Sequence, residues 1–300
     1  MNIQELRSVD IDGLKVVGIG THCTVYKIEP DKVLKVFIDD VKIEDVEQEY
    51  KYMKMAQNLG IKTPQAYEIV NVNGQYGIIS ELIEGVTLYQ YLSEHRVDAQ
   101  KIYKSFGELG RSIHSLHVPE GTLESVKMLF SKRVDRSAKL YTEDEIKDLH
   151  EILDAIPDGD SLIHDDFHPN NMLTTDGKLT LIDLADMGYG NKLFDLGGTY
   201  MGLIYFPKHF IKSAGYVDTT RKDKKNFWNA LIDAEYPGAD RKTRKLINQR
   251  CEYMALLKMS LARIIDVDTD NRRAKYAVNL CRKKILPNKD KIIRLFSMEL

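Results

Sequence analysis

The sequence lacks the features that cross-link a chain or anchor it in a membrane. Its three cysteines, Cys23, Cys251 and Cys281, are odd in number, and none stands at the spacing of a metal or redox motif. No apolar run approaches the roughly 18 residues that a membrane span needs. The polar residues 1–13 contain no apolar core of a signal peptide. The sequence therefore predicts no disulfide framework and no membrane partner, and we expect a cytoplasmic protein.

Repeats and low-complexity segments are also absent, but the two signs of charge are unevenly distributed. Residues 1–195 carry 21 Lys and Arg against 34 Asp and Glu, whereas residues 196–300 carry 22 against 11. This asymmetry indicates either an anion-binding region or a solvated helical surface with clustered lysines. The basic residues lie on helical stripes without interleaved aromatic residues or a reading motif, so we expect no nucleic-acid partner.

The first part of the chain has the periodicity of a small sheet with one helix. Three antiparallel strands are predicted at residues 15–18, 24–28 and 33–37, and a hairpin at 66–72 and 76–82 around Asn73-Gly74. Residues 43–59 switch to helical periodicity, and Gly60 ends that helix.

After Glu84-Gly85 the pattern is mainly helical. Asp98 is a candidate cap for a helix over residues 99–117, and Thr142 with Glu145 forms a capping box for a helix over residues 143–155. Four or five further helices are predicted within residues 196–300, punctuated by Pro207, Pro237 and Pro287. The chain is therefore predicted as an α+β protein with residues 1–84 and 85–300 as its two parts.

The most informative segment is Leu162 to Asp195, which carries Asp166, Asn171 and Asp183 at fixed spacings. A hairpin through residues 175–177 would bring the oxygens of Asn171 and Asp183 together. Two such oxygens suit a Mg²⁺ ion that carries substrate phosphates. Asp166, a few residues upstream, could then act as base toward a hydroxyl, which is the layout of a phosphoryl-transfer site.

His164 and His168 flank Asp166, and their four-residue spacing raises the alternative of a zinc site. That spacing suits zinc on a helix, and Pro169 makes a helix improbable there. We therefore expect His164 to hold the loop through a hydrogen bond with the backbone. His168 is expected to contact either the phosphate that is transferred or the acidic residues beside it.

Two features nearer the N-terminus suit a phosphate-binding role but also have simpler explanations. Gly18 and Gly20 lie in a loop between strands and let backbone amides approach phosphates, although hairpin glycines often only make turns. No Gly-Lys-Ser/Thr follows, so this is not a Walker A loop. Lys35 lies within an apolar strand and either faces solvent or clamps phosphate, paired with a carboxylate of the next helix. The candidates for that carboxylate are Glu44, Glu47 and Glu49, and we select Glu49 with Glu47 as the fallback.

These residues together resemble a known family. The segments His164-Asp165-Asp166-Phe167-His168-Pro169-Asn170-Asn171 and Ile182-Asp183, followed by Phe194-Asp195-Leu196, are similar to the catalytic core of the aminoglycoside phosphotransferase and choline kinase-like branch of the protein-kinase-like fold. The similarity extends in order from residue 18 to residue 195. It implies two lobes, namely a small antiparallel β N-lobe with one helix that binds nucleotide, and a larger helical C-lobe with the catalytic loop and substrate-binding helices.

The resemblance implies a function for each matching position. Asp166 would be the catalytic base, Asn171 and Asp183 would hold Mg²⁺, and Asp195 would brace the catalytic loop. Lys35, paired with Glu49, would contact the α- and β-phosphates of ATP, and Gly18 and Gly20 would cover the phosphates. The backbone of a hinge from Glu81 to Ile83 would meet the adenine.

The chain also departs from the family pattern. Asp165 and Asn170 replace glycines, and Leu184-Ala185 stands where Phe-Gly is more common. Asp165 beside Asp166 could raise the pKa of one carboxyl through like-charge repulsion. No catalytic side chain is lost, so we expect an ATP- and Mg²⁺-dependent kinase acting on a small-molecule hydroxyl, with its oligomeric state left open.

Other functions and several acceptor classes remain as alternatives. A catalytically silent nucleotide-binding module is one, and a protein kinase is another, although no Ala-Pro-Glu segment follows Asp183. The basic C-terminal region argues against an aminoglycoside, and a sugar, an amino alcohol or an anionic metabolite remains open. An aromatic cage for a quaternary cation is conceivable, but helical spacing favours core packing for its candidate rings, which are Tyr200, Tyr205, Phe206, Phe227 and Trp228.

Overall fold

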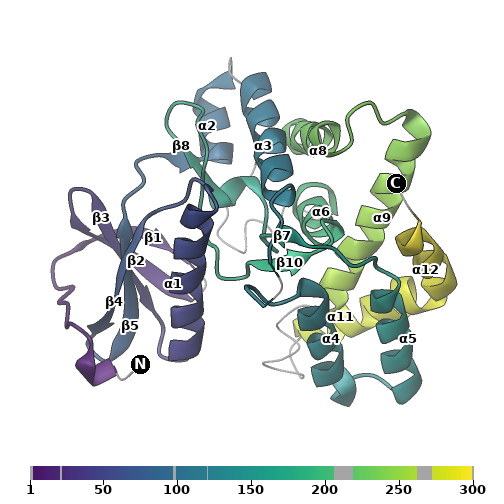
Figure 1. The fold of residues 1–300 in the computed structure, drawn as a ribbon, viewed down its shortest axis with the longest axis horizontal. Helices are drawn as coiled ribbons and strands as arrows, with labels where there is room; N and C mark the ends of the chain where they lie inside the picture. Colours follow the sequence, from purple (N-terminus) through teal and green to yellow (C-terminus); the bar gives the residue numbers. More distant parts are fainter. Residues whose placement is uncertain are drawn as a thin grey trace. The chain divides into compact units, whose positions relative to one another are not determined.

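A computed structural model of the chain describes residues 3–20, 22–96, 99–119, 121–205, 219–261 and 272–298. The chain forms two compact units, one of Met1–Glu94 with Asn170–Asp186 and one of His95–Pro169 with Met187–Leu300 (Figure 1). The roles assigned above to residues 1–84 and 85–300 stay predictions. Asp98, Phe206 and Pro207, which were singled out in the sequence, lie outside the described residues.

The first unit contains a five-stranded antiparallel sheet in the order β1-β2-β3-β5-β4. Its strands are β1 Lys15–Ile19, β2 Cys23–Glu29, β3 Lys32–Phe37, β4 Ala66–Val72 and β5 Gln75–Glu81. The three predicted N-terminal strands and the β4–β5 hairpin are thus confirmed. Asn73 and Gly74 form the hairpin turn with φ angles of 53° and 92°, a region that asparagine and glycine tolerate.

A single helix, α1 Ile43–Asn58, packs against β4 and β5 of this sheet (Figure 1). The helical periodicity predicts a buried stripe of Val46, Tyr50, Met53, Ala56 and Leu59. Val46, Met53 and Ala56 are buried together with Tyr52 and the acidic Glu49, whereas Tyr50 and Leu59 are half-buried. Gly60 has a φ of 79° and donates its N–H to the Gln57 carbonyl, which ends the helix as predicted.

A second, three-stranded sheet completes the first unit and positions the segment around Asp183. It consists of β6 Val86–Thr87, β8 Met172–Thr174 and β9 Thr180–Leu181, in the order β6-β8-β9, with α2 Leu88–Glu94 packed beside β6 and β8. The predicted hairpin between residues 171 and 183 is confirmed. Gly177 closes its turn with a φ of 87° and an N–H donated to the Thr174 hydroxyl. The pairing of β8 with β6 explains why residues 170–186 belong to the first unit.

The second unit is mainly helical. Its helices are α3 Ala99–His114, α4 Val126–Arg136, α5 Glu143–Asp154, α6 Leu193–Tyr200, α8 Arg221–Glu235, α9 Arg241–Ser260, α11 Arg272–Leu280 and α12 Lys289–Ser297. Two strands, β7 Ser161–Ile163 and β10 Gly188–Gly190, pair antiparallel. In the described part of the chain, the remaining short elements are the 3-10 helices Ile3–Glu5, Ser137–Lys139, Pro169–Asn171 and Leu286–Asn288 and the π-helical turns Met201–Tyr205 and Cys281–Ile285. The predicted capping box between Thr142 and Glu145 begins α5.

Among the described residues, no helix has both the length and the apolar character that crossing a bilayer requires.

The helices α3 and α8 of the second unit pack closely, and their approach depends on a glycine. A Cβ atom on Gly107 would lie 2.3 Å from the carbonyl oxygen of Ala230, which is backbone and has little freedom to move. The close approach lets Phe106 of α3 pack edge-on against Phe227 of α8, with ring centroids 5.0 Å apart. Gly107 therefore sets the spacing of these two helices.

We predict that Gly107→Ala destabilises the protein, because overpacking of a tight contact costs roughly 1–3 kcal/mol. Gly202→Ala is the matched control, since a Cβ there meets nothing within 4 Å, and alanine is favoured over glycine in helices by up to about 1 kcal/mol. Urea unfolding of both variants measures the difference. Equal free energies of unfolding for the two variants would contradict the assigned role of Gly107.

Candidate functional site

A cleft of about 650 Å³ opens in the first unit, and every described residue that lines it belongs to that unit. Its walls come from the sheet, from α1, from the connection after β5 and from the β8–β9 hairpin. Six residues that the sequence singled out line it together: Gly20, Lys35, Glu49, Glu81, Ile83 and Asp183. Gly18 lies in β1 opposite Val25, and Asn171 lies directly before β8.

Lys35 is held in this cleft by an ion pair. Because side chains alternate along β3, Leu34 and Val36 enter the apolar core, and Lys35 points from the other face toward α1. Its ammonium lies 2.6 Å from Glu49 Oε1 and 3.9 Å from Asp183 Oδ1. Burial acts to lower the pKa of Lys35, but the two carboxylates outweigh it and raise the pKa, so the lysine stays charged. Glu49 is thus the observed partner among the three candidate glutamates.

The turn after β1 is shaped by Cys23 as well as by glycine. The Gly20 N–H donates to the Cys23 carbonyl at 2.9 Å, and a Cβ on Gly20 would lie 2.8 Å from the Cys23 sulfur. A side chain at position 20 would therefore require the Cys23 thiol to shift. Burial raises the pKa of the Cys23 thiol above its usual range, so this thiol is not activated as a thiolate.

Asn171 and Asp183 are brought together by the β8–β9 ladder. The Ile182 N–H donates to the Asn171 carbonyl at 2.9 Å, and Asp183 follows directly with a left-handed φ of 62°. An amide and a carboxylate offer the hard oxygen donors that Mg²⁺ prefers. The described residues contain no group of three or more His, Cys, Asp or Glu side chains able to hold a metal. The amide and the carboxylate of this hairpin could hold Mg²⁺, which usually keeps several waters and takes one or two protein ligands together with substrate phosphates.

The second unit carries the loop with Asp166 and His168. The Asp166 carboxylate is 44% exposed, and His168 Nε2 lies 3.3 Å from its Oδ2 atom. The Asp166 N–H points to His164 Nδ1 at 3.2 Å, so the His164 ring holds the loop backbone as predicted. Asp166 and His168 thus form a polar pair on a loop whose backbone is held by the His164 ring.

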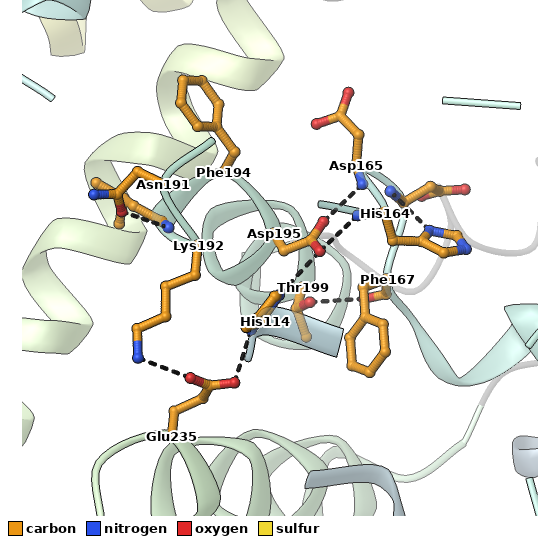
Figure 2. Close-up of polar contacts among 12 residues, drawn as sticks. His114, His164, Asp165, Phe167, Asn191, Lys192, Phe194, Asp195, Thr199 and Glu235 are labelled. Atoms are coloured by element: carbon orange, nitrogen blue, oxygen red, sulfur yellow. Dashed lines mark hydrogen bonds and ion pairs between the residues drawn. The ribbon is translucent and has the colours of Figure 1, made fainter. Parts of the chain in front are cut away.

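That loop rests on the buried carboxylate of Asp195 (Figure 2). One Asp195 oxygen accepts the His164 N–H at 2.8 Å, and the other accepts the Asp165 N–H at 2.7 Å. His114 Nε2 lies 3.0 Å from Asp195, and its Nδ1 lies 2.7 Å from Glu235. Lys192 Nζ in turn lies 2.8 Å from the other Glu235 oxygen.

His114 and Glu235 were missed by the sequence analysis. Burial acts to lower the pKa of His114, but its hydrogen bonds to Asp195 and Glu235 raise the pKa to about 9, so the ring is an imidazolium at neutral pH. The one local signal was a polar residue at a buried position of an amphipathic helix, which is weak by itself.

Three of the aromatic residues considered for a cationic ligand, Tyr200, Phe227 and Trp228, make ring contacts within the second unit. Phe227 and Trp228 are buried, Tyr200 contacts Trp228 edge-on at 5.0 Å, and the Trp228 indole N–H donates to Asn248. The helical spacing that favoured core packing is thus confirmed for these three rings.

We predict a loss of stability in mild alkali that depends on His114. The folded state holds this proton more tightly than the unfolded chain, whose histidines titrate near 6.5. The resulting stabilisation is complete below about pH 6.5 and is lost as the pH rises through about 9. The free energy of unfolding should fall by roughly 3 kcal/mol across this window.

Chemical denaturation at several pH values measures this slope. His114→Asn should abolish it, whereas His117→Asn should keep it, because His117 is exposed and pairs with Asp160 at the surface. An unchanged slope in His114→Asn would show that another group titrates.

Comparisons with known proteins bear on the family and the fold of this chain. Residues 13–214 match the model of the phosphotransferase enzyme family, and no curated protein sequence matches the chain. The chain is similar to APH(2")-IIa in a ternary complex with streptomycin and ATP, with 16% identity, a TM-score of 0.63 and coverage of 96% of this chain and 94% of that chain.

Two further solved structures are similar over nearly their whole length. A choline/ethanolamine kinase family protein from Mesorhizobium loti has 16% identity, a TM-score of 0.58 and coverage of 95% and 92%. APH(2")-IIia in complex with GDP and kanamycin has 14% identity, a TM-score of 0.55 and coverage of 94% of both chains. These structures confirm the predicted α+β kinase-like fold. Since the family match spans more than half of its length, the chain belongs to the phosphotransferase enzyme family.

Proposed function

We propose that this protein is an ATP- and Mg²⁺-dependent kinase that phosphorylates a hydroxyl group of a small molecule. The observation that carries the proposal is the charged cluster of Lys35, Glu49 and Asp183 on the wall of the first unit's cleft. A largely buried ion pair is weak evidence for a purely stabilising role, which favours a functional use of the Lys35 charge. A triphosphate would use that charge, because Lys35 lines a cleft large enough for a nucleotide.

The cleft also suits the purine of ATP. Its apolar walls can sandwich a flat base, and they include Val17, Val25, Val33, Ile78, Leu173 and Ile182. The N–H groups of Glu81 and Leu82 already donate to the carbonyls of Gln65 and Asp31. We therefore assign the hinge contact with the base to Ile83. The similar solved structures include complexes with ATP and with GDP, which supports nucleotide use by this fold.

Asn171 and Asp183 would hold the Mg²⁺ ion, which neutralises charge on the triphosphate as the transferred group develops it. Asp183 also lies 3.9 Å from Lys35, so the carboxylate links the ion to the phosphate-binding lysine. Its left-handed backbone is strained for a residue other than glycine, and such strain is concentrated at functional sites.

Asp166 serves as the base in this proposal. The acceptor hydroxyl oxygen forms a bond to the γ-phosphorus, the bond to the β–γ bridging oxygen breaks, and ADP leaves. Asp166 orients the hydroxyl and takes its proton, while His168 orients the Asp166 carboxylate. Asp166 and Asn171 are five residues apart in the chain, so at most about 18 Å of extended backbone separates base from metal ligand.

The acceptor classes that we consider are sugars, amino alcohols and hydroxylated anions. The similar solved structures were obtained with streptomycin and with kanamycin, and both compounds therefore belong in any panel of acceptors. A catalytically silent nucleotide-binding module and a protein kinase are the rival functions, and both give distinct outcomes in the same assay.

We predict ATP turnover with at least one acceptor of such a panel and a loss of roughly 10²-fold or more in kcat for Asp166→Ala. Binding of ATP should persist, because Asp166 does not line the nucleotide cleft. Transfer of labelled phosphate, followed by separation of small molecules from protein, measures both. Nucleotide binding without any transfer would favour the silent module, and label on protein alone would favour the protein kinase.

A second prediction concerns Lys35. Lys35→Met should lower kcat/KM for ATP by roughly 10²–10³-fold, because it removes a fixed charge aimed at the transferring phosphates. Lys32→Met is the matched control, since Lys32 lies on the same strand and pairs with Glu29 at the surface. Steady-state kinetics and thermal unfolding of both variants separate the catalytic effect from a stability effect. Similar kinetics in the two variants would refute the phosphate-binding role.

A further inference from the structure

Asp165, the residue directly before Asp166, has an unusual backbone. Its φ is 64°, in the left-handed region that glycine enters most readily. Among the described residues other than glycine, only Asn73 and Asp183 also have a positive φ, and Asn73 lies in a hairpin turn. Strain of this kind persists only where the surroundings enforce it. The contacts of Asp165 show what enforces it here.

The Asp165 side chain is buried against two cations of the second unit. Lys258 Nζ from α9 lies 2.6 Å from Oδ1, and an Arg133 nitrogen from α4 lies 3.8 Å from Oδ2. The side chains of Asp165 and Lys258 are each 7% exposed, and that of Arg133 is 12% exposed. Both cations also lie over the Phe130 ring, with Arg133 4.5 Å and Lys258 5.7 Å from its centroid. The two acids of the loop therefore have separate environments, one buried with cations and one half exposed beside His168.

Lys258 also fixes the backbone that leads to Asp166. Its ammonium donates to the Asp165 carbonyl at 3.0 Å as well as to the Phe194 carbonyl at 3.2 Å. On the other side of the same peptide unit, the Asp166 N–H points to His164 Nδ1. The peptide between Asp165 and Asp166 is thus held at both its oxygen and its nitrogen. Gly198 leaves the room for this, because a Cβ there would lie 3.0 Å from the Lys258 ammonium.

A buried ion pair seldom stabilises a fold more than apolar residues of the same size would. Here such a pair is combined with a left-handed backbone at one residue, so two unfavourable features coincide next to the proposed base. Neither feature is needed to complete a helix or a strand. Their shared effect is to fix the peptide that sets the direction of Asp166.

We propose that Asp165 and Lys258 form a positioning device that orients Asp166 toward the acceptor hydroxyl. The proposal rests on the proposed function, since it assigns a role in the same reaction. It predicts that the pair acts on kcat and not on nucleotide affinity, because all the residues lining the nucleotide cleft belong to the first unit. A misdirected base lowers the rate of transfer even when both substrates bind.

Asp165→Gly separates positioning from stability. Glycine relieves the left-handed strain, so a purely structural role predicts that the activity follows the stability of the variant. The positioning role predicts a fall in kcat of roughly 10- to 100-fold, with the KM for ATP within about 2-fold of wild type. Lys258→Met should give the same kinetic result, and Asp165→Gly carries the test alone if Lys258→Met fails to fold. Lys289→Met is the control, because Lys289 pairs with Asp148 and Glu151 elsewhere in the second unit and should leave kcat unchanged.

The decisive measurement repeats Asp165→Gly in an Asp166→Asn background, with labelled ATP and the best acceptor of the panel. If Asp165 acts through Asp166, the residual kcat of Asp166→Asn falls no further. The proposal is overturned if Asp165→Gly keeps wild-type kcat, or if it lowers kcat equally in both backgrounds. If wild type binds ATP but transfers phosphate to no acceptor, the proposed function fails, and the positioning role fails with it. Transfer by wild type with an unaffected Asp165→Gly refutes the positioning role alone.

Discussion

The Asp195 carboxylate is fully buried, and the second unit is arranged to keep it charged. A buried carboxylate is tolerable only with several donors around it. Asp195 receives the N–H groups of His164 and Asp165 and a contact from the His114 ring. Burial acts to raise the pKa of Asp195, but the His114 interactions and the loop amides outweigh it and lower the pKa. Satisfying this one charge therefore fixes the loop backbone, and it joins α3 and α6 to that loop (Figure 2).

The first unit meets the same constraint with a different pair. Glu49 is buried and Lys35 is half-buried, and burial raises the pKa of Glu49 against the opposing charge of Lys35. Removing either partner would leave an uncompensated charge, so the ion pair fixes α1 relative to β3. Both units thus place a compensated charge beside a group that would meet substrate. In each, the same interaction stabilises the local structure and orders the functional side chain.

The features that could be predicted from the sequence depend on residues close together in the chain. The Asn73-Gly74 turn, the Thr142 capping box and the β8–β9 hairpin each depend on residues within a few positions, and all three are confirmed. The choice of Glu49 succeeded because one helical stripe limits which glutamates can reach β3. Glu235 and Lys258 could not be found in this way. Glu235 lies 121 residues from His114, and Lys258 lies 93 residues from Asp165, so only the packed fold brings these partners together. The strands β7 and β10, of three residues each, are too short to show a period.

The folded structure also changes the meaning of the charge asymmetry. Several of the basic residues in positions 196–300 neutralise acids that precede them in the chain. Arg282 pairs with Glu145, Lys289 with Asp148, and Lys258 with Asp165. Arg250 instead donates to the Phe296 and Met298 carbonyls at the end of α12, where a cation also complements the helix dipole. Because all these pairs lie within the second unit, part of the formal charge of the C-terminal region is neutralised inside that unit. That charge therefore argues neither for an anionic acceptor nor against a cationic one. The acceptor's charge must instead be decided by the side chains that surround Asp166, which makes a panel with both kinds of acceptor the informative experiment.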